Sequence, residues 1–133
     1  LGFFTFNHVH PEILAQAHQS SARYPKEVSE FDATGLTPFF VPSFPSPFVK
    51  ESQVRIGLEF CEEYKIKAND TILIIGAVKQ IHVPSHVVSE QGHIDLDRTE
   101  SLTVANLDTY YFAKKLIRLS YAKPDRPLRD ITE

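Results

Sequence analysis

The sequence predicts a mainly β fold with flanking helices, in which two long strands coil into a barrel or a strongly curved sheet. Apolar residues recur at every second position, or a multiple of it, across 54–64, which is the period of a half-buried strand. The run 71–83 is apolar at both parities, which is typical of a strand covered on both faces. Each run is about 13 residues long, which at roughly 3.3 Å per residue is twice the usual strand.

Strands of this length cannot stay flat in a chain of 133 residues, so we expect them to coil. Each strand carries one interior glycine, Gly57 or Gly76, where a bend or a barrel corner is easy. These observations favour a barrel, with a sandwich of interrupted strands as the alternative.

The register of this hairpin follows from its loop. If Lys67–Asp70 is a four-residue loop, Ile66 lies opposite Thr71 and Phe60 lies opposite Ala77. One face then holds Ile56, Phe60, Tyr64, Leu73, Ala77 and Ile81. A slip by one residue would bring glutamates to that face, so the pattern specifies the register strongly.

The segment before the hairpin is expected to begin with a strand over 2–9, whose Phe4, Phe6 and Val9 face a core. A helix starts at Pro11 and runs to about residue 21, since proline suits a first helical position. The chain breaks near residue 25, and a short helical turn then ends at Gly35.

Residues 36–52 hold four prolines and four phenylalanines, which predicts an extended strap whose aromatic rings plug the side of the barrel. The alternative is an exposed aromatic patch that meets a second subunit. Beyond the hairpin, the sequence predicts a helix from about Asp108 to Pro124. Tyr111, Leu116 and Leu119 form its expected inner face, with Lys114 and Lys115 outside.

Composition bounds the function. The net charge is −3, with 14 basic and 17 acidic residues, which is no electrostatic footprint for nucleic acid. No apolar run has the length of a membrane span. The single Cys61 excludes an internal disulfide and fits a cytoplasmic protein. We expect one domain over residues 1–133 that lacks strands preceding Leu1, because the chain opens directly on a strand.

Two clusters could bind a ligand by residue type alone. His8 and His10 are two apart on a strand, so both imidazoles could share a metal, although surface or capping histidines give the same pattern. Ser20, Ser21, Arg23 and Lys26 surround a broken helix and would suit a phosphate, against the alternative of a solvated helix end. No nucleophile elbow, Walker loop or dinucleotide-binding glycine run is present.

Several stretches together resemble one known family. They are GFFTFN, SARYPKEVSEFDATGLTP, PFVKES followed by QVRIGLEFCEEYKI, NDTILIIGAVKQIHV, and a terminal segment with two adjacent tyrosines. The chain from Gly2 to about Tyr121 is similar to the flavin reductase-like, FMN-binding split-barrel family, in its flavoredoxin-like branch. The resemblance implies a six-stranded Greek-key split barrel with flanking helices, and a homodimer that holds FMN near the subunit interface.

The resemblance also implies a function. Such proteins pass hydride from NADH or NADPH to flavin, or carry electrons on bound FMN. At matching positions it implies cofactor contacts from Asn7, Ser21, Arg23, Lys26, Tyr110 and Tyr111, and it assigns no catalytic residue and no metal ligand. Much of the family's flavin pocket lies on strands that precede the start of this chain. We therefore expect residues 1–133 alone not to hold FMN stably.

The chain departs from the family at Asp70. Many of the family's NADH-dependent reductases carry a histidine just before the second hairpin strand, where it helps to seat the nicotinamide, and this chain has Asp70 there. Hydride transfer is the cofactor's own chemistry, so the departure affects the electron donor more than flavin binding. The alternatives are a non-catalytic FMN-binding split barrel and a metal-binding β domain.

Overall fold

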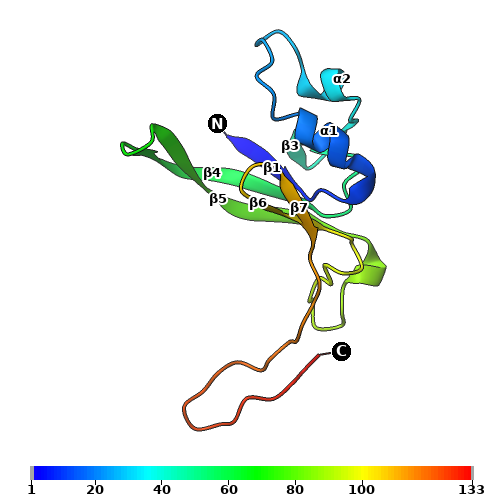
Figure 1. Ribbon diagram of the computed structural model, residues 1–133, viewed down its shortest axis with the longest axis vertical. Helices are drawn as coiled ribbons and strands as arrows, with labels where there is room; N and C mark the ends of the chain where they lie inside the picture. The colour runs from blue at the N-terminus through cyan, green and yellow to red at the C-terminus, as the bar shows by residue number, and fades with distance from the viewer. Residues whose placement is uncertain (1, 133) are drawn as a thin grey trace.

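The computed structural model describes residues 2–132, and its main feature is one long antiparallel hairpin (Figure 1). Three strands form a sheet in the order β1-β4-β5: β1 (Phe3–Asn7), β4 (Arg55–Ile66) and β5 (Thr71–His82). Two further hairpins pair β2 (Pro38–Val41) with β3 (Phe44–Val49), and β6 (Leu102–Ala105) with β7 (Thr109–Phe112). All pairs are antiparallel, and the predicted mainly β class is confirmed.

The helices are few and short, and the two predicted in the first third of the chain are present. A 3₁₀ turn η1 (Pro11–Ile13) runs into α1 (Leu14–Gln19), and the chain restarts as α2 (Glu30–Thr34). Gly35 ends α2 in the left-handed conformation at φ 74°, which glycine adopts without steric cost. A second 3₁₀ turn, η2 (Ser85–Val87), follows β5. Within residues 2–132 no helix is both long and apolar enough to cross a membrane.

The core draws its buried residues from η1, β3, β4 with the residue before it, and η2. Its buried apolar residues are Ile13, Phe44, Phe48, Val54, Leu58 and Val87. Phe44 and Phe48 are 4% and 0% exposed, so the prediction that phenylalanines of residues 36–52 fill the core is confirmed for these two rings. Phe40 remains 62% exposed. Phe6, predicted to face the core, is 57% exposed, and that prediction is wrong.

Residues 36–52 form the β2–β3 hairpin rather than an irregular strap. Prolines fit here because a two-stranded sheet leaves one edge of each strand unpaired, where the missing N–H costs no ladder bond. Side chains, not a ladder, fasten β3 to β1: Thr5 donates to the carbonyl of Pro47 at 2.9 Å, and Ser46 donates to that of Phe3 at 2.9 Å. The β2–β3 hairpin therefore forms a second layer on the main sheet.

The register of β4 and β5 agrees with the prediction at both ends and differs in the middle. Ile66 pairs with Thr71 as expected, but Phe60 pairs with Gly76 instead of Ala77. The ladder skips Cys61 in β4 and Lys79 in β5, so each strand contains one bulge. Since a bulge reverses the alternation, Tyr64 lies on the face opposite Phe60, and the predicted single apolar face is wrong.

The predicted cover on both faces of β5 is also wrong for the part of the molecule that the structure describes. At the loop end of the hairpin the apolar side chains are exposed, and we call them the hairpin-tip patch: Tyr64, Ile66, Ile72, Leu73, Ile74 and Ile75. Their exposed fractions run from 37% to 57%. Figure 1 shows why, because this end of β4 and β5 projects beyond the other sheets.

The predicted helix over 108–124 is not formed. Residues 109–112 are strand β7, and residues 113–132 continue as an extended arm that folds back on itself below the sheets (Figure 1). Leu116, expected on the inner face, is 94% exposed, whereas Lys115, expected outside, is half-buried against Asp95. The run Thr-Tyr-Tyr-Phe is rich in β-formers, and its pairing with β6 overrides the helical spacing.

Candidate functional site

Tyr110 is placed by the β6–β7 hairpin, which turns tightly at Asn106 with φ 58°. The turn brings β7 back beside β1 and α1, so that the Tyr110 ring meets His18 edge to face at 5.8 Å between ring centroids. A hydrogen bond of 2.9 Å joins the Tyr110 hydroxyl and His18 Nδ1. This pair locks the hairpin to the first helix and fixes the orientation of the tyrosine ring.

Two shallow grooves meet at Tyr110. The first has a volume of about 580 Å³ and lies between α1 and β7, with the lining residues Pro11, Leu14, Ala15, His18, Asp108 and Tyr110. The second, of about 310 Å³, lies between β1 and β6–β7 and includes Asn7, His8, Val9, Ser101, Val104 and Tyr110. Both are mostly apolar with few polar groups, as ligand sites for flat aromatic molecules are.

A chain of hydrogen bonds forms the polar floor of the second groove. His8 Nδ1 and the Ser101 hydroxyl lie 3.0 Å apart, and that hydroxyl lies 2.7 Å from the hydroxyl of Thr99. Ser101 and Thr99 are buried. Burial lowers the pKa of His8 from its ordinary value, so the ring is uncharged at neutral pH. The groove therefore offers a neutral hydrogen-bonding group instead of a cation.

Asn7 lines the same groove as Tyr110, so the structure brings two of the predicted cofactor residues together. Its side chain is already bonded: Nδ2 donates to the Thr5 hydroxyl at 3.0 Å, and Oδ1 accepts from the backbone N–H of Val49 at 3.0 Å. Asn7 thus ties β1 to β3 and shapes the groove wall.

The remaining predicted residues lie apart from these grooves. Ser21, Arg23 and Lys26 are exposed on the loop between α1 and α2, and the Ser21 hydroxyl donates to the carbonyl of His18 at 2.8 Å. Tyr111 follows Tyr110 on a strand, so it points to the opposite face, where it is 55% exposed. Of the two tyrosines, Tyr110 is the one that lines the grooves.

The two histidines of the H-x-H pattern have separate partners. His8 bonds to Ser101, and His10 Nε2 lies 3.0 Å from the carbonyl oxygen of Glu51. Among the described residues, no group of three or more histidine, cysteine, aspartate or glutamate side chains is arranged to hold a metal ion. His10 also occupies the N-cap position of η1.

Sequence reasoning missed His18 and Ser101 as members of the site. Each is separated by more than 90 residues from its partner, Tyr110 or His8, so no local spacing could reveal the contact.

A comparison with solved structures decides the family. A split-barrel protein from Shewanella frigidimarina, assigned as a flavin reductase, matches with a TM-score of 0.86 and 43% identity over 91% of this chain. The chain belongs to the flavin reductase-like split-barrel family. The predicted Greek-key split barrel is therefore confirmed as the fold class, and the sandwich alternative is dropped.

Two more distant structures share the split-barrel fold. They are nitrilotriacetate monooxygenase component B from Bacillus cereus (22% identity, TM-score 0.75, 89% of this chain) and the flavoredoxin of Desulfovibrio vulgaris (20%, 0.72, 93%). This split-barrel chain spans 61%, 60% and 63% of the three matched chains, respectively. No family model and no curated protein matches the sequence.

Proposed function

We propose that the protein binds FMN and works as an oxidoreductase of the flavin reductase or flavoredoxin type. Electrons would come from NADH, NADPH or a protein donor. The observation that carries the proposal is the pair of apolar grooves at Tyr110, in a chain that is 43% identical to a split-barrel protein assigned as a flavin reductase.

The grooves suit one side of a flavin. A flat ring system can lie against an aromatic side chain whose orientation is fixed, and Tyr110 is fixed by His18. The neutral His8 and the Ser101 hydroxyl can hydrogen-bond to polar atoms at a ring edge without adding charge. The flavin supplies the redox chemistry, and the chain's residues bind it, orient it and limit its contact with water.

The loop between α1 and α2 is proposed to reach the flavin's phosphate. Arg23 and Lys26 are exposed on it and carry the charge that a phosphate requires. The Ser21 hydroxyl is engaged by the end of α1, so its role is to fix the loop. Tyr111 would contact the flavin only from the face of β7 opposite to Tyr110.

A second candidate is a split barrel that binds FMN without turnover, and one observation favours it. Asp70 occupies the hairpin loop where many reductases of the family carry histidine, and it forms an exposed ion pair with Lys65 at 3.1 Å. The carboxylate of this ion pair accepts hydrogen bonds and has no hydrogen to donate to a nicotinamide.

We propose that the subunits are cytoplasmic and that residues 1–133 belong to a single split-barrel domain. For partners, we propose a homodimer. The support for the homodimer is the hairpin-tip patch, whose six apolar side chains are exposed in the single chain.

The test is the visible absorption spectrum of the full-length protein after incubation with FMN and removal of unbound flavin, followed by anaerobic addition of NADH. Flavin bands that bleach support the reductase, and bands that persist point to an electron carrier with another donor or to the binder. Tyr110→Ala should weaken FMN binding about fivefold or more, because ring stacking contributes roughly 1–3 kcal/mol. The matched control is Tyr121→Ala, since Tyr121 is 86% exposed on the arm. No flavin bands after FMN addition would contradict both candidates.

A further inference from the structure

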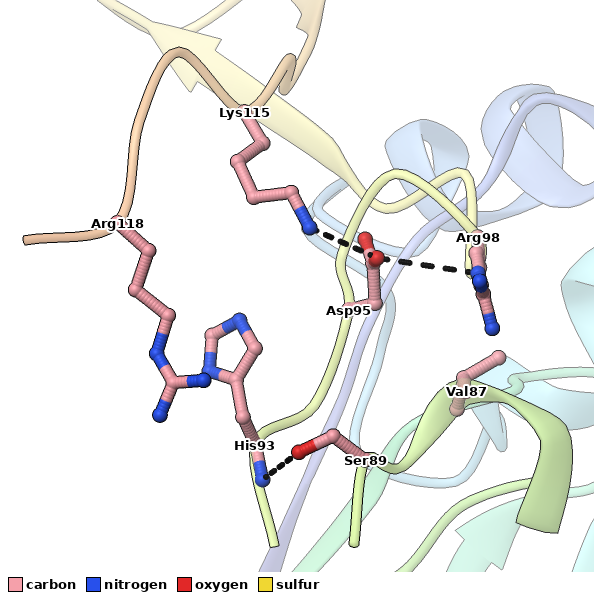
Figure 2. A pocket seen from close by; sticks show the side chains of 7 residues that line it. All are labelled: Val87, Ser89, His93, Asp95, Arg98, Lys115 and Arg118. Atoms are coloured by element: carbon pink, nitrogen blue, oxygen red, sulfur yellow. Dashed lines mark hydrogen bonds and ion pairs between the residues drawn. The ribbon is translucent and has the colours of Figure 1, made fainter. Parts of the chain in front are cut away.

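A small pocket lined by cationic side chains lies where the arm meets the loop after η2 (Figure 2). Its volume is about 120 Å³, and its lining residues are Val87, Ser89, His93, Asp95, Arg98, Lys115 and Arg118. Drug-sized and nucleotide-sized ligands need pockets of about 300 Å³ or more. The volume therefore suits one small group, such as a single ionic head.

The charge of the lining selects an anion. Arg98, Lys115 and Arg118 face a single carboxylate, so two positive charges are in excess. The surplus is local, because the chain as a whole carries a net charge of −3. A concave site with an excess of one sign of charge raises the local concentration of the opposite ion.

The negative charge of the one carboxylate is already balanced by an ion pair within the pocket. Asp95 Oδ2 accepts from Lys115 Nζ at 3.0 Å, and Figure 2 shows Lys115 and Arg98 on either side of it. The hydrogen bond from Lys115 lowers the pKa of Asp95, so the carboxylate stays charged. The Nε atom of Arg98 is farther away, at 3.8 Å. Asp95 therefore holds Lys115 in place. Arg98 is partly engaged as well, because its Nη1 donates to the backbone carbonyl of His86 at 3.0 Å.

Arg118 is the most available cation. Within residues 2–132 it has no carboxylate partner, and its Nη2 donates to the amide oxygen of Gln91 at 3.2 Å. Its backbone N–H is fixed by the Thr132 hydroxyl at 2.8 Å. The side chain lies beside His93 on the far side of the pocket from Arg98 (Figure 2). A half-buried guanidinium with unused N–H groups is suited to bidentate binding of an oxyanion.

Ser89 adds a neutral donor. Its oxygen accepts from the backbone N–H of His93 at 3.2 Å, which leaves the hydroxyl proton to donate into the pocket. Guanidinium, ammonium and hydroxyl donors around a small hollow form the donor set that phosphate oxygens prefer. We propose that this pocket binds a phosphate group.

Two sources of the group share this chemistry: inorganic phosphate and the 2′-phosphate of NADPH. The second source has a route on the surface. A neighbouring groove of about 290 Å³ shares His93, Asp95, Lys115 and Arg118 with the pocket, and it shares Leu96 and Ala113 with the groove at Asn7 and Tyr110. The nucleotide source rests on the proposed function, whereas binding of free phosphate does not.

The experiment titrates the full-length protein with inorganic phosphate by calorimetry, without flavin turnover. Arg118→Gln should weaken phosphate binding about tenfold or more, since a charged hydrogen bond contributes roughly 1.5–3 kcal/mol. Arg118→Lys should lose less, because it keeps the charge. Arg126→Gln, a matched change on the same arm outside the pocket, should bind like the unmodified protein. Equal phosphate affinity in Arg118→Gln and the unmodified protein, or no phosphate binding by the latter, would overturn the proposal.

A second titration identifies the source by comparing NADPH with NADH. Tighter binding of NADPH that is lost in Arg118→Gln assigns the pocket to the nucleotide's 2′-phosphate. Equal binding of the two nucleotides, with phosphate binding intact, assigns it to free phosphate. Because the phosphate titration needs no flavin, a failure of FMN binding would leave its outcome unchanged.

Discussion

His8 is a histidine that the fold keeps uncharged, and this makes stability depend on pH. Burial lowers its pKa from the ordinary value of 6.5. As the pH falls below 6.5, the unfolded chain takes up a proton before the folded one does. The free energy of unfolding should therefore be lower at about pH 5.5 than at about pH 7.5, and His8→Gln should reduce this loss.

Urea denaturation of the full-length protein at the two pH values measures the effect. The control is His86→Gln, because His86 is an exposed residue of η2. His86→Gln should keep the pH dependence of the unmodified protein. If His8→Gln keeps it too, the buried ring is not its source.

At the scale of one strand, Gly57 shows why β4 needs a glycine. A Cβ atom at this position would lie 2.9 Å from two atoms of the Phe44 ring and 3.2 Å from the Phe48 ring. Both rings are buried and cannot swing away. Gly57→Ala should therefore lower the free energy of unfolding by about 1–3 kcal/mol, as overpacking does.

Thermal or urea unfolding of the full-length protein checks this value. Gly2→Ala is the matched control, since nothing lies within 4 Å of a Cβ added there. A smaller ring should relieve the clash, so Phe44→Leu should cost less in the Gly57→Ala background than alone. Strictly additive effects of the two substitutions would show that the ring and the glycine do not meet.

The elements that the sequence predicted well are those with local signals. The backbone preferences of proline, glycine, asparagine and aspartate act locally. The structure has a helix start at Pro11, a helix end at Gly35 and a hairpin loop at Asn69–Asp70. For Gly57 and Gly76 the sequence predicts a bend of the strand. Instead, aromatic rings pack on them, which is a tertiary contact that a single strand cannot reveal.

The errors in the elements arise from competition between patterns. Residues 108–124 have apolar spacing close to that of a helix, yet Thr109–Phe112 find a partner strand in β6. Once these residues pair, the following segment cannot continue a helix and runs on as the arm. Bulges at Cys61 and Lys79 have no signature in an alternating sequence, so the reversal of faces beyond them was not foreseen.

For the whole molecule, the hairpin-tip patch predicts association. Leu73 is 52% exposed near the end of the hairpin among other apolar side chains. If the patch lies in a dimer interface, Leu73→Glu buries an unpaired charge there and should raise the dissociation constant of the dimer at least about tenfold. Analytical ultracentrifugation of the full-length protein measures this constant.

Val28→Glu provides the control for that prediction. Val28 is 38% exposed but belongs to the loop before α2, so its replacement should leave the dimer unchanged. A dimer equally stable with Leu73→Glu would place the interface elsewhere. A monomeric unmodified protein would contradict the homodimer itself.

The candidate site was predictable only in part, because it is assembled across the whole molecule. The resemblance supplied Asn7 and Tyr110, which the structure places in one groove. It could not supply His18, whose contact with Tyr110 depends on how the β6–β7 hairpin packs on α1. The cationic pocket was missed for the same reason, since Lys115 and Arg118 were assigned to a helix that does not form.

The bulges in β4 and β5 also bear on how this hairpin can evolve in length. Cys61 and Lys79 are the residues that the ladder passes over, so each strand holds one position without a paired neighbour across the hairpin. Loss of either residue would shorten one strand while every existing pair, from Arg55 with His82 to Ile66 with Thr71, could be kept. An added residue would have no partner position across the hairpin and would need a new bulge. The hairpin can therefore shorten by single residues more readily than it can lengthen.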